Sequence, residues 1–347
     1  GMALTVDEAT RIVQFCLAGD GWGKATAEGD AVAIHLMVNG AERAQPYEFR
    51  AETFEAALQA AVEAGVLKAA AVDKQIAFLR RTASHSGRAT GEAPRFHEAT
   101  AVVSALIHET QRERGVSSLY AASGGRLFQR ELTLQWRNTE RRRAELAAFR
   151  DRCAGHLPGG ASGRLTAAGE ALAEVLVSRA AVESLKLRPP ELIAAYNRVN
   201  REYLQAIDAL LAMVTDPAQR ATALAWVALL NAKEKTGIER AQLVAAFERD
   251  RYADGQYQAI LGLIAARDSY LHLFSDAAPA PARELLQEQL ASEVAGAVRR
   301  MEEVALARRR GGFGVDPTTW FAAISAQIDR LAALETAVRS SLAGSFA

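Results

Sequence analysis

HETQRERGVSSLYA (residues 108–121) and AKEKTGIERAQLVAAF (residues 232–247) are the two stretches that decide the fold of this chain. Both have the periodicity of amphipathic helices. Arg114 falls inside the apolar or small stripe of the first helix, which consists of Val103, Ile107, Thr110, Ser117 and Ala121. Arg240 interrupts the stripe of the second, which consists of Leu229, Thr236, Leu243 and Phe247. Because a buried guanidinium needs an anion or carboxylates beside it, the two arginines predict a buried anion site.

Ion pairs along each helix are the alternative explanation for these arginines. Glu113 precedes the first arginine and Glu239 precedes the second, and the further carboxylates Glu109 and Glu234 lie one to two turns away. Such pairs on a half-exposed face satisfy arginines in many helices. The sequence leaves both explanations open for either arginine taken alone.

The repetition of a Glu-Arg-small triplet favours the anion site. The triplet occurs in both helices, and each helix also carries a nearby glycine, Gly115 or Gly237. Small residues at these positions allow a ligand or a second backbone to come close. Gln111 lies nearly on the face of Arg114 and can donate a hydrogen bond to an oxyanion.

Other polar residues on helical stripes are weaker candidates for the site. Arg179 replaces an apolar residue on the stripe of a third helix, and we include it in the predicted ligand-binding set. Asn197 and Asn200 share a face with apolar residues and are either pocket members or core amides with satisfied hydrogen bonds. Arg112 lies about 160° around the helix from Arg114, so the two cannot face one pocket.

The two stretches resemble the NIT domain family, a nitrate- and nitrite-sensing all-helical module of bacterial signalling proteins. LIHETQRERGVS (106–117) is similar to the opening helix of the family, and KEKTGIERA (233–241) is similar to its Lys-Glu-x-x-Gly-x-Glu-Arg-Ala helix. The resemblance continues through residues 178–185, 190–203 and 320–335, so that it covers about residues 95–345. Thr110 departs from the family, which usually has leucine there.

The resemblance implies a nitrate or nitrite ligand held by Arg114, Arg240 and Arg179. Gln111, Glu113, Gly115, Gly237 and Glu239 are the expected supporting residues. The residues alone predict a small oxyanion, because a guanidinium presents a planar fork of donors to two oxygens. The neighbouring carboxylates suit a monovalent anion better than phosphate. In the family the sensor is usually joined to an output domain such as an RNA-binding antiterminator, a kinase or a cyclase.

Composition favours a helical, cytoplasmic protein. The chain has 347 residues, of which half are hydrophobic and 7% aromatic, with 9 prolines. Its 41 basic residues equal its 41 acidic residues, so no global field indicates a nucleic-acid or membrane partner. No apolar run is long enough to span a membrane. The two cysteines, Cys16 and Cys153, lie far apart in sequence and indicate a reducing compartment.

The chain divides into a small α+β module at residues 1–81, a Ser/Thr/Gly/Pro-rich linker at 82–94 and a helical sensor at 95–345. The module is expected to contain helices at 6–16, 52–64 and 70–81, a strand at 32–38 and a hairpin turn at Asn39-Gly40 that leads to residues 46–49. Sensor helices are expected at about 95–122, 124–154, 163–186, 189–214, 216–251, 256–273, 279–308 and 317–344. Short connections predict two antiparallel four-helix bundle units, with the Glu-Arg helices in equivalent places.

Enzymatic interpretations find little support. The sequence has no phosphate-binding glycine loop, no zinc-like or di-iron spacing and no interpretable nucleophile and base, so we expect no enzyme, metal or cofactor. We expect a signalling protein that transmits by helix rearrangement to a regulatory partner of unknown identity. Any in-chain output would have to be the module at residues 1–81, whose role the sequence does not indicate. The alternative is a helical scaffold or adaptor without a small-molecule ligand. A homodimer is left open.

Overall fold

The computed structural model describes residues 3–17, 20–40, 44–83 and 94–343. The chain folds into two compact units, each described by itself below. The first contains residues 1–88, 286–304 and 315–333, and the second contains 89–285, 305–314 and 334–347. Residues 84–93 of the predicted linker lie outside the described residues.

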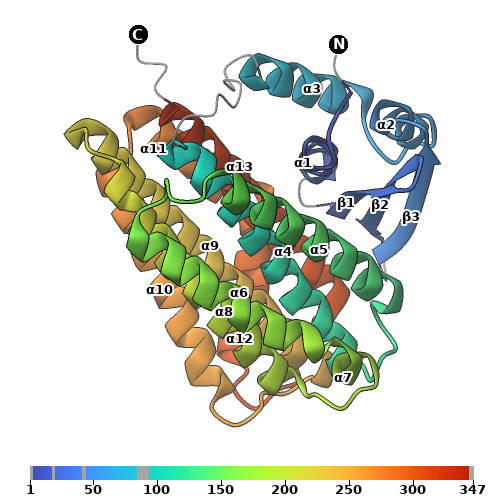
Figure 1. The fold of residues 1–347 in the computed structure, drawn as a ribbon. Helices are drawn as coiled ribbons and strands as arrows, with labels where there is room; N and C mark the ends of the chain where they lie inside the picture. The colour runs from blue at the N-terminus through green and yellow to red at the C-terminus, as the bar shows by residue number, and fades with distance from the viewer. Residues whose placement is uncertain (1–2, 18–19, 41–43, 84–93, 344–347) are drawn as a thin grey trace. The chain divides into compact units, whose positions relative to one another are not determined.

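The first unit contains a three-stranded antiparallel sheet in the order β1-β2-β3, formed by β1 (Gly21–Glu28), β2 (Ala31–Asn39) and β3 (Ala44–Ala51). The helices of the module are α1 (Val6–Leu17), α2 (Phe54–Glu63) and α3 (Ala69–Ala83) (Figure 1). Apolar side chains from α1, α2 and β2, among them Ile12, Leu58 and Ile34, share one core. The α+β character expected of the module is confirmed.

Strand β1, which the periodicity did not predict, has the sequence GWGKATAE. Two glycines weaken its strand signal. Both are required by close packing, since a Cβ at Gly21 would lie 2.0 Å from the Met37 carbonyl oxygen and one at Gly23 would lie 2.3 Å from Val13 Cγ1 of α1. The glycines that hide the strand in the sequence therefore allow β2 and α1 to approach it.

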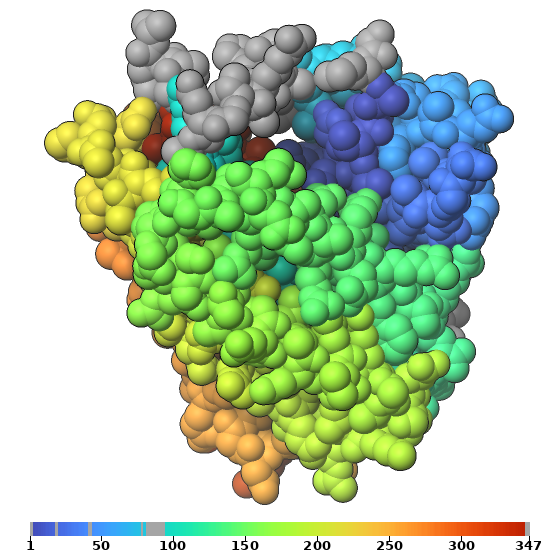
Figure 2. All heavy atoms as spheres, viewed as in Figure 1, coloured from blue at the N-terminus to red at the C-terminus, as the bar shows by residue number. Residues whose placement is uncertain are grey.

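The second unit is helical. It contains α4 (Phe96–Ala122), α5 (Gln129–Arg152), α6 (Gly159–Val177), α7 (Arg179–Glu183), α8 (Pro189–Leu210), α9 (Pro217–Arg249) and α10 (Gln256–Ala277). Helix α4 packs against α5, α8 and α9, while α6 packs on α8 and α10 packs on α9. In Figure 2 the side chains of α5, α6 and α8, in shades of green, cover the near face of this unit.

The remaining helices are α11 (Ala280–Leu290), α12 (Glu293–Ala307) and α13 (Pro317–Ser341). The all-helical body is confirmed, in the predicted order. Two expected helices are each divided: the segment 163–186 breaks after Val177, and the segment 279–308 breaks after Leu290. Ser292 Oγ accepts from Ala295 N at 3.3 Å, which is the N-cap contact that starts a new helix.

Capping residues explain where the long helices begin. Asp216 caps α9 by accepting from Gln219 N at 3.0 Å, and Pro217 follows at the first turn. Pro189 and Pro190 likewise occupy the first turn of α8, whereas its N-cap residue, Arg188, makes no side-chain capping hydrogen bond. None of the helices among the described residues contains a stretch hydrophobic enough for a membrane span.

Candidate anion site

The two motif helices, α4 and α9, pack directly against each other. Ser118 Oγ of α4 donates to the Ala241 carbonyl oxygen of α9 at 2.7 Å, so the helices approach closely where small residues meet. Almost every α4 residue between 103 and 120 is buried. Arg112 and Arg114 point to different sides of α4, yet both are buried, because the helix is enclosed by its neighbours all around.

Arg114 is fully buried and holds the carboxylate of Glu234 from α9. Its Nη1 lies 3.0 Å from Glu234 Oε2 and its Nη2 lies 2.8 Å from Oε1, which makes a bidentate pair. Arg114 Nη1 also donates to Asn197 Oδ1 of α8 at 3.0 Å. The sequence indicated Glu234 as a partner for the arginine of its own helix, and the structure pairs it across helices instead.

Glu234 is surrounded by donors from two neighbouring helices. Besides Arg114, Gln111 Nε2 of α4 and Asn200 Nδ2 of α8 each lie 3.2 Å from Oε1. Thr110 Oγ1 donates to Asn200 Oδ1 at 2.6 Å and fixes the orientation of that amide. We call the donors Arg114, Gln111 and Asn200, with the Glu234 carboxylate that they hold, the carboxylate cradle. Thr110, which departs from the family, thus has a defined polar role.

Gly237 gives Arg114 the space it occupies. A Cβ at this position would lie 2.6 Å from Arg114 Nη2, and Gln111 Cγ would follow at 3.7 Å. Glycine therefore allows the guanidinium to lie against the backbone of α9. Gly115 is buried on the opposing helix.

Arg240 of α9 contacts the backbone of Gln111 in α4. Its Nη2 donates to the Gln111 carbonyl oxygen at 3.0 Å. Arg114 and Gln111 share Glu234, and Arg240 contacts the backbone of Gln111, so Gln111 connects the two predicted arginines. Glu239 is paired with Arg267 of α10, at 3.2 Å.

Arg179 belongs to a second polar cluster. From the start of α7 it binds Glu113 through Nη2 at 2.6 Å and Nε at 3.3 Å, and its Nη1 lies 2.8 Å from Glu140. Tyr196 also donates to Glu113. Burial alone would lower the pKa of Arg179, but the hydrogen bonds and charge of Glu113 outweigh it and raise that pKa. Arg179 and Glu113 therefore neutralise each other as a separate pair beside the cradle.

Sequence reasoning left one feature of this core open and missed another. Asn197 contacts Arg114 directly, although its face suggested a core amide as readily as a pocket residue. Lys233 is buried and pairs with Glu335 of α13 at 2.7 Å. Its position next to Glu234 in the Lys-Glu motif was the signal that could have identified it.

A groove of about 560 Å³, lined by both polar and apolar side chains, runs between α8, α9 and α10. Both Asn197 and Glu234 lie in its lining, so the groove reaches two partners of Arg114. Arg201 and Lys235 add positive charge to the same lining, and Asp208 adds negative charge. The cradle is therefore adjacent to an open groove that contains charged side chains.

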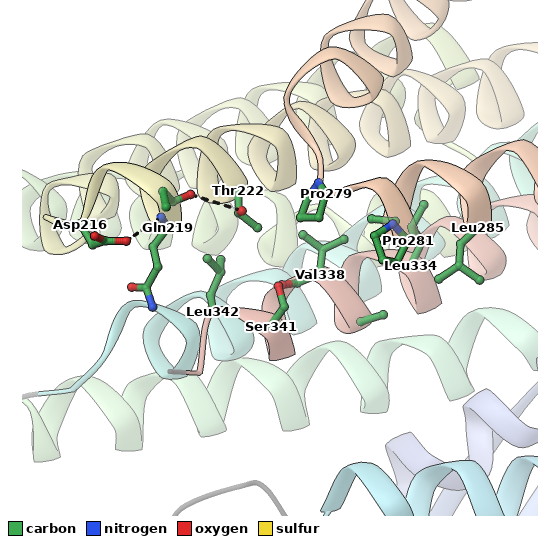
Figure 3. A pocket seen from close by; sticks show the side chains of 13 residues that line it. Asp216, Gln219, Thr222, Pro279, Pro281, Leu285, Leu334, Val338, Ser341 and Leu342 are labelled. Carbon is green, nitrogen blue, oxygen red and sulfur yellow. Dashed lines mark hydrogen bonds between the residues drawn. The ribbon is translucent and has the colours of Figure 1, made fainter. Parts of the chain in front are cut away.

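A second cavity, of about 600 Å³, has the opposite character. It lies between the start of α9, α11 and the end of α13 and is lined by apolar side chains such as Leu285, Leu334 and Val338 (Figure 3). Its Ser341 hydroxyl donates to the Val338 carbonyl, and the described residues that line it include no arginine, lysine or histidine. It does not suit an anion. Within the described ranges, no three His, Cys, Asp or Glu side chains group as metal ligands.

Comparison with known proteins agrees with the helical core. A nitrate regulatory protein of Klebsiella oxytoca is 26% identical over 238 residues, which are 67% of this chain and 59% of that protein. The structure of the NasR transcription antiterminator shares the fold with a TM-score of 0.67 at 22% identity, over 78% of this chain and 73% of that one. The names of both relatives describe regulators. Residues 105–343 match the NIT family, described as nitrate and nitrite sensing. By this match over most of its length, the chain belongs to the NIT family of nitrate- and nitrite-sensing domains.

Proposed function

We propose that the second unit binds nitrate or nitrite between α4 and α9 and that binding changes a regulatory output. The observation that carries this proposal is the carboxylate cradle. Arg114, Gln111 and Asn200 surround a planar group with two oxygens in the buried core of the unit. Nitrate and nitrite are also planar and offer two oxygens at similar spacing, so the same donors can engage them.

Arg240 provides the second cation. It approaches Gln111 from α9, six residues or about 1.7 turns after Glu234 along the helix, and it is as well buried as Arg114. Two guanidinium groups on neighbouring helices favour an anion that contacts both. Arg179 is the third candidate, and its pairing with Glu113 gives it a supporting position beside the site.

The balance of charge supports a monovalent ligand. The acidic side chains Glu113, Glu234 and Glu239 each pair with an arginine in this core. Little positive charge therefore remains for a phosphate or another multivalent anion. In a core of low dielectric constant, an excess negative charge would be costly.

Regulation is supported by the relatives rather than by the site. One is a nitrate regulatory protein and the other a transcription antiterminator. The chain spans 59% of the length of the curated relative, so the output of this protein is itself part of the proposal. We infer that an anion-dependent change in α4–α8–α9 packing reaches a regulatory partner. Free cysteines at positions 16 and 153 support a cytoplasmic location.

Isothermal titration calorimetry tests the proposal with nitrate, nitrite, chloride and sulfate at constant ionic strength. Saturable binding of nitrate or nitrite, with no heat from chloride or sulfate, is the expected result. A helical scaffold, whose arginines would only form ion pairs, would show no saturable binding of any of the four anions. That result would overturn the proposed sensing function.

A further inference from the structure

Glu234 already occupies the position that an oxyanion would take at Arg114. Its two oxygens lie 2.8 and 3.0 Å from the two terminal nitrogens of the guanidinium. The side-chain amides of Gln111 and Asn200 donate hydrogen bonds to the same carboxylate. A nitrate or nitrite that binds Arg114 through two oxygens cannot do so while this carboxylate remains in place.

The groove between α8, α9 and α10 offers a place for the displaced carboxylate. Glu234 is in its lining, so the side chain lies between the buried guanidinium and the open groove. Besides Glu234, the lining of the groove contains two cations, Arg201 of α8 and Lys235 of α9, against one other carboxylate, that of Asp208. A rotation of the Glu234 side chain away from Arg114 therefore moves it toward water and cations, and avoids the cost of burying an unpaired carboxylate.

We propose that Glu234 is an internal competitor that sets the anion affinity of this protein. Its carboxylate holds Arg114 in the unliganded state, and nitrate or nitrite binds by replacing it and sending it into the groove. The inference rests on the proposed function, because it concerns the same arginine. It adds a specificity-determining residue and a direction of movement.

Replacement of Glu234 also changes the contacts of α8. In the unliganded state Asn200 donates to Glu234, and Asn197 accepts from Arg114, which Glu234 also binds. An anion in place of the carboxylate transfers those bonds from a side chain of α9 to a free ligand. In the unliganded state the Glu234 side chain, which is part of α9, links α9 to α8, and a free ligand in its place removes that link. A ligand shifts a conformational equilibrium only through contacts that differ between the two states.

The test replaces the carboxylate with a neutral side chain of the same shape. Glu234→Gln should bind nitrate about tenfold more tightly or better, because a charge-assisted pair no longer opposes the ligand. Glu335→Gln is the matched control, since Glu335 is a buried carboxylate paired with a cation of α9, Lys233, outside the cradle. Its nitrate affinity should equal that of the unmodified protein in the same titration.

A second variant protects the test against loss of folding. Glu234→Asp keeps the charge but shortens the side chain, which breaks the bidentate pair and should also tighten nitrate binding. Circular dichroism identifies which variants are folded. If the unmodified protein binds nitrate and neither folded variant binds more tightly, the proposal that Glu234 competes with the anion is overturned, while the proposed nitrate-sensing function stands. If none of the proteins binds nitrate or nitrite, the proposed function fails and this inference fails with it.

The role of the groove is tested by filling it. Gly262 of α10 lines the groove, and a Cβ there would meet no atom within 4 Å. Gly262→Trp should weaken nitrate binding about tenfold or more, because the carboxylate then has no place to move. Gly169→Trp on α6, also open at Cβ, is the control and should bind normally. Equal affinity in both tryptophan variants would remove the groove from the mechanism.

Discussion

Gly237 and Arg114 are fitted to each other across two helices, because a Cβ on Gly237 would lie 2.6 Å from Arg114 Nη2. The guanidinium occupies the volume that any other residue at 237 would fill. The glycine of the Lys-Glu-x-x-Gly-x-Glu-Arg-Ala motif thus has a steric cause. This relationship leads to the first prediction.

Gly237→Ala should displace Arg114 from Glu234 and reduce nitrate binding. Overpacking of a buried site of this kind costs about 1–3 kcal/mol of unfolding free energy. Urea unfolding and calorimetry measure the two effects. Gly169→Ala on α6, where a Cβ meets open space, should instead be neutral or slightly stabilising. Equal stability and affinity in the two alanine variants would contradict the steric role.

Lysine in place of Arg114 or Arg240 should abolish the nitrate response while the fold persists. Lysine keeps the charge but lacks the planar pair of donors. A loss of about tenfold or more in nitrate affinity would therefore show that the donor geometry of arginine, and not its charge alone, binds the ligand. Arg112→Lys is the control, because Arg112 is equally buried on α4 but lies on another side of the helix. If both site variants titrate like the control, Arg114 and Arg240 do not bind the ligand.

Nitrate should raise the melting temperature. At a free concentration 100-fold above the dissociation constant, a ligand adds about 2.7 kcal/mol to the unfolding free energy, which corresponds to several degrees for a domain of this size. Sodium chloride at the same ionic strength measures the contribution of screening. A shift of equal size with both salts would argue against a specific site.

The phenol of Tyr196 should make the free energy of unfolding depend on pH in the alkaline range. Burial, followed by the charge of Glu113, raises the pKa of its phenol well above the usual value near 10. The folded state therefore keeps the proton when the unfolded chain loses it, and the stability that depends on it is complete below about pH 10 and declines above.

Tyr196→Phe removes that dependence. The difference in melting temperature between the unmodified protein and the variant should narrow from about pH 9 to about pH 11, as the unmodified protein loses its advantage. At neutral pH the variant should be less stable, because Glu113 loses one of its donors. A difference that stays constant across this range would be inconsistent with the raised pKa.

Helix positions were readable from the sequence because their ends carry local signals. Pro190 and Asp216-Pro217 mark the starts of α8 and α9, and both helices begin where these residues predict. The breaks at Ser178 and Ser292 were overlooked because the periodicity on either side of each serine remains helical. β1 was overlooked because its glycines serve packing rather than strand propensity.

The sequence predicted only part of the carboxylate cradle. Arg114 and Gln111 share a face of α4, as their spacing suggested, and both lie close to Gly237 of α9. The identity of their partner, Glu234, was not readable, because periodicity assigns a residue to a face of its own helix but does not say which residue of another helix it meets. The stripe on α4 was also too narrow a description, since a helix enclosed by α5, α8 and α9 buries polar residues on every side.

The bidentate pair between Arg114 and Glu234 fixes the rotational setting of α9 against α4. Sliding α9 by one residue turns each of its side chains by about 100° and would carry Glu234 away from the guanidinium and Lys233 away from Glu335. Breaking a buried pair costs about 3–5 kcal/mol, so each such slip is strongly disfavoured. Alanine and leucine, which are frequent in the rest of α9, pack almost equally well in several settings. The charged residues thus select one axial register from a set that apolar packing would leave nearly degenerate.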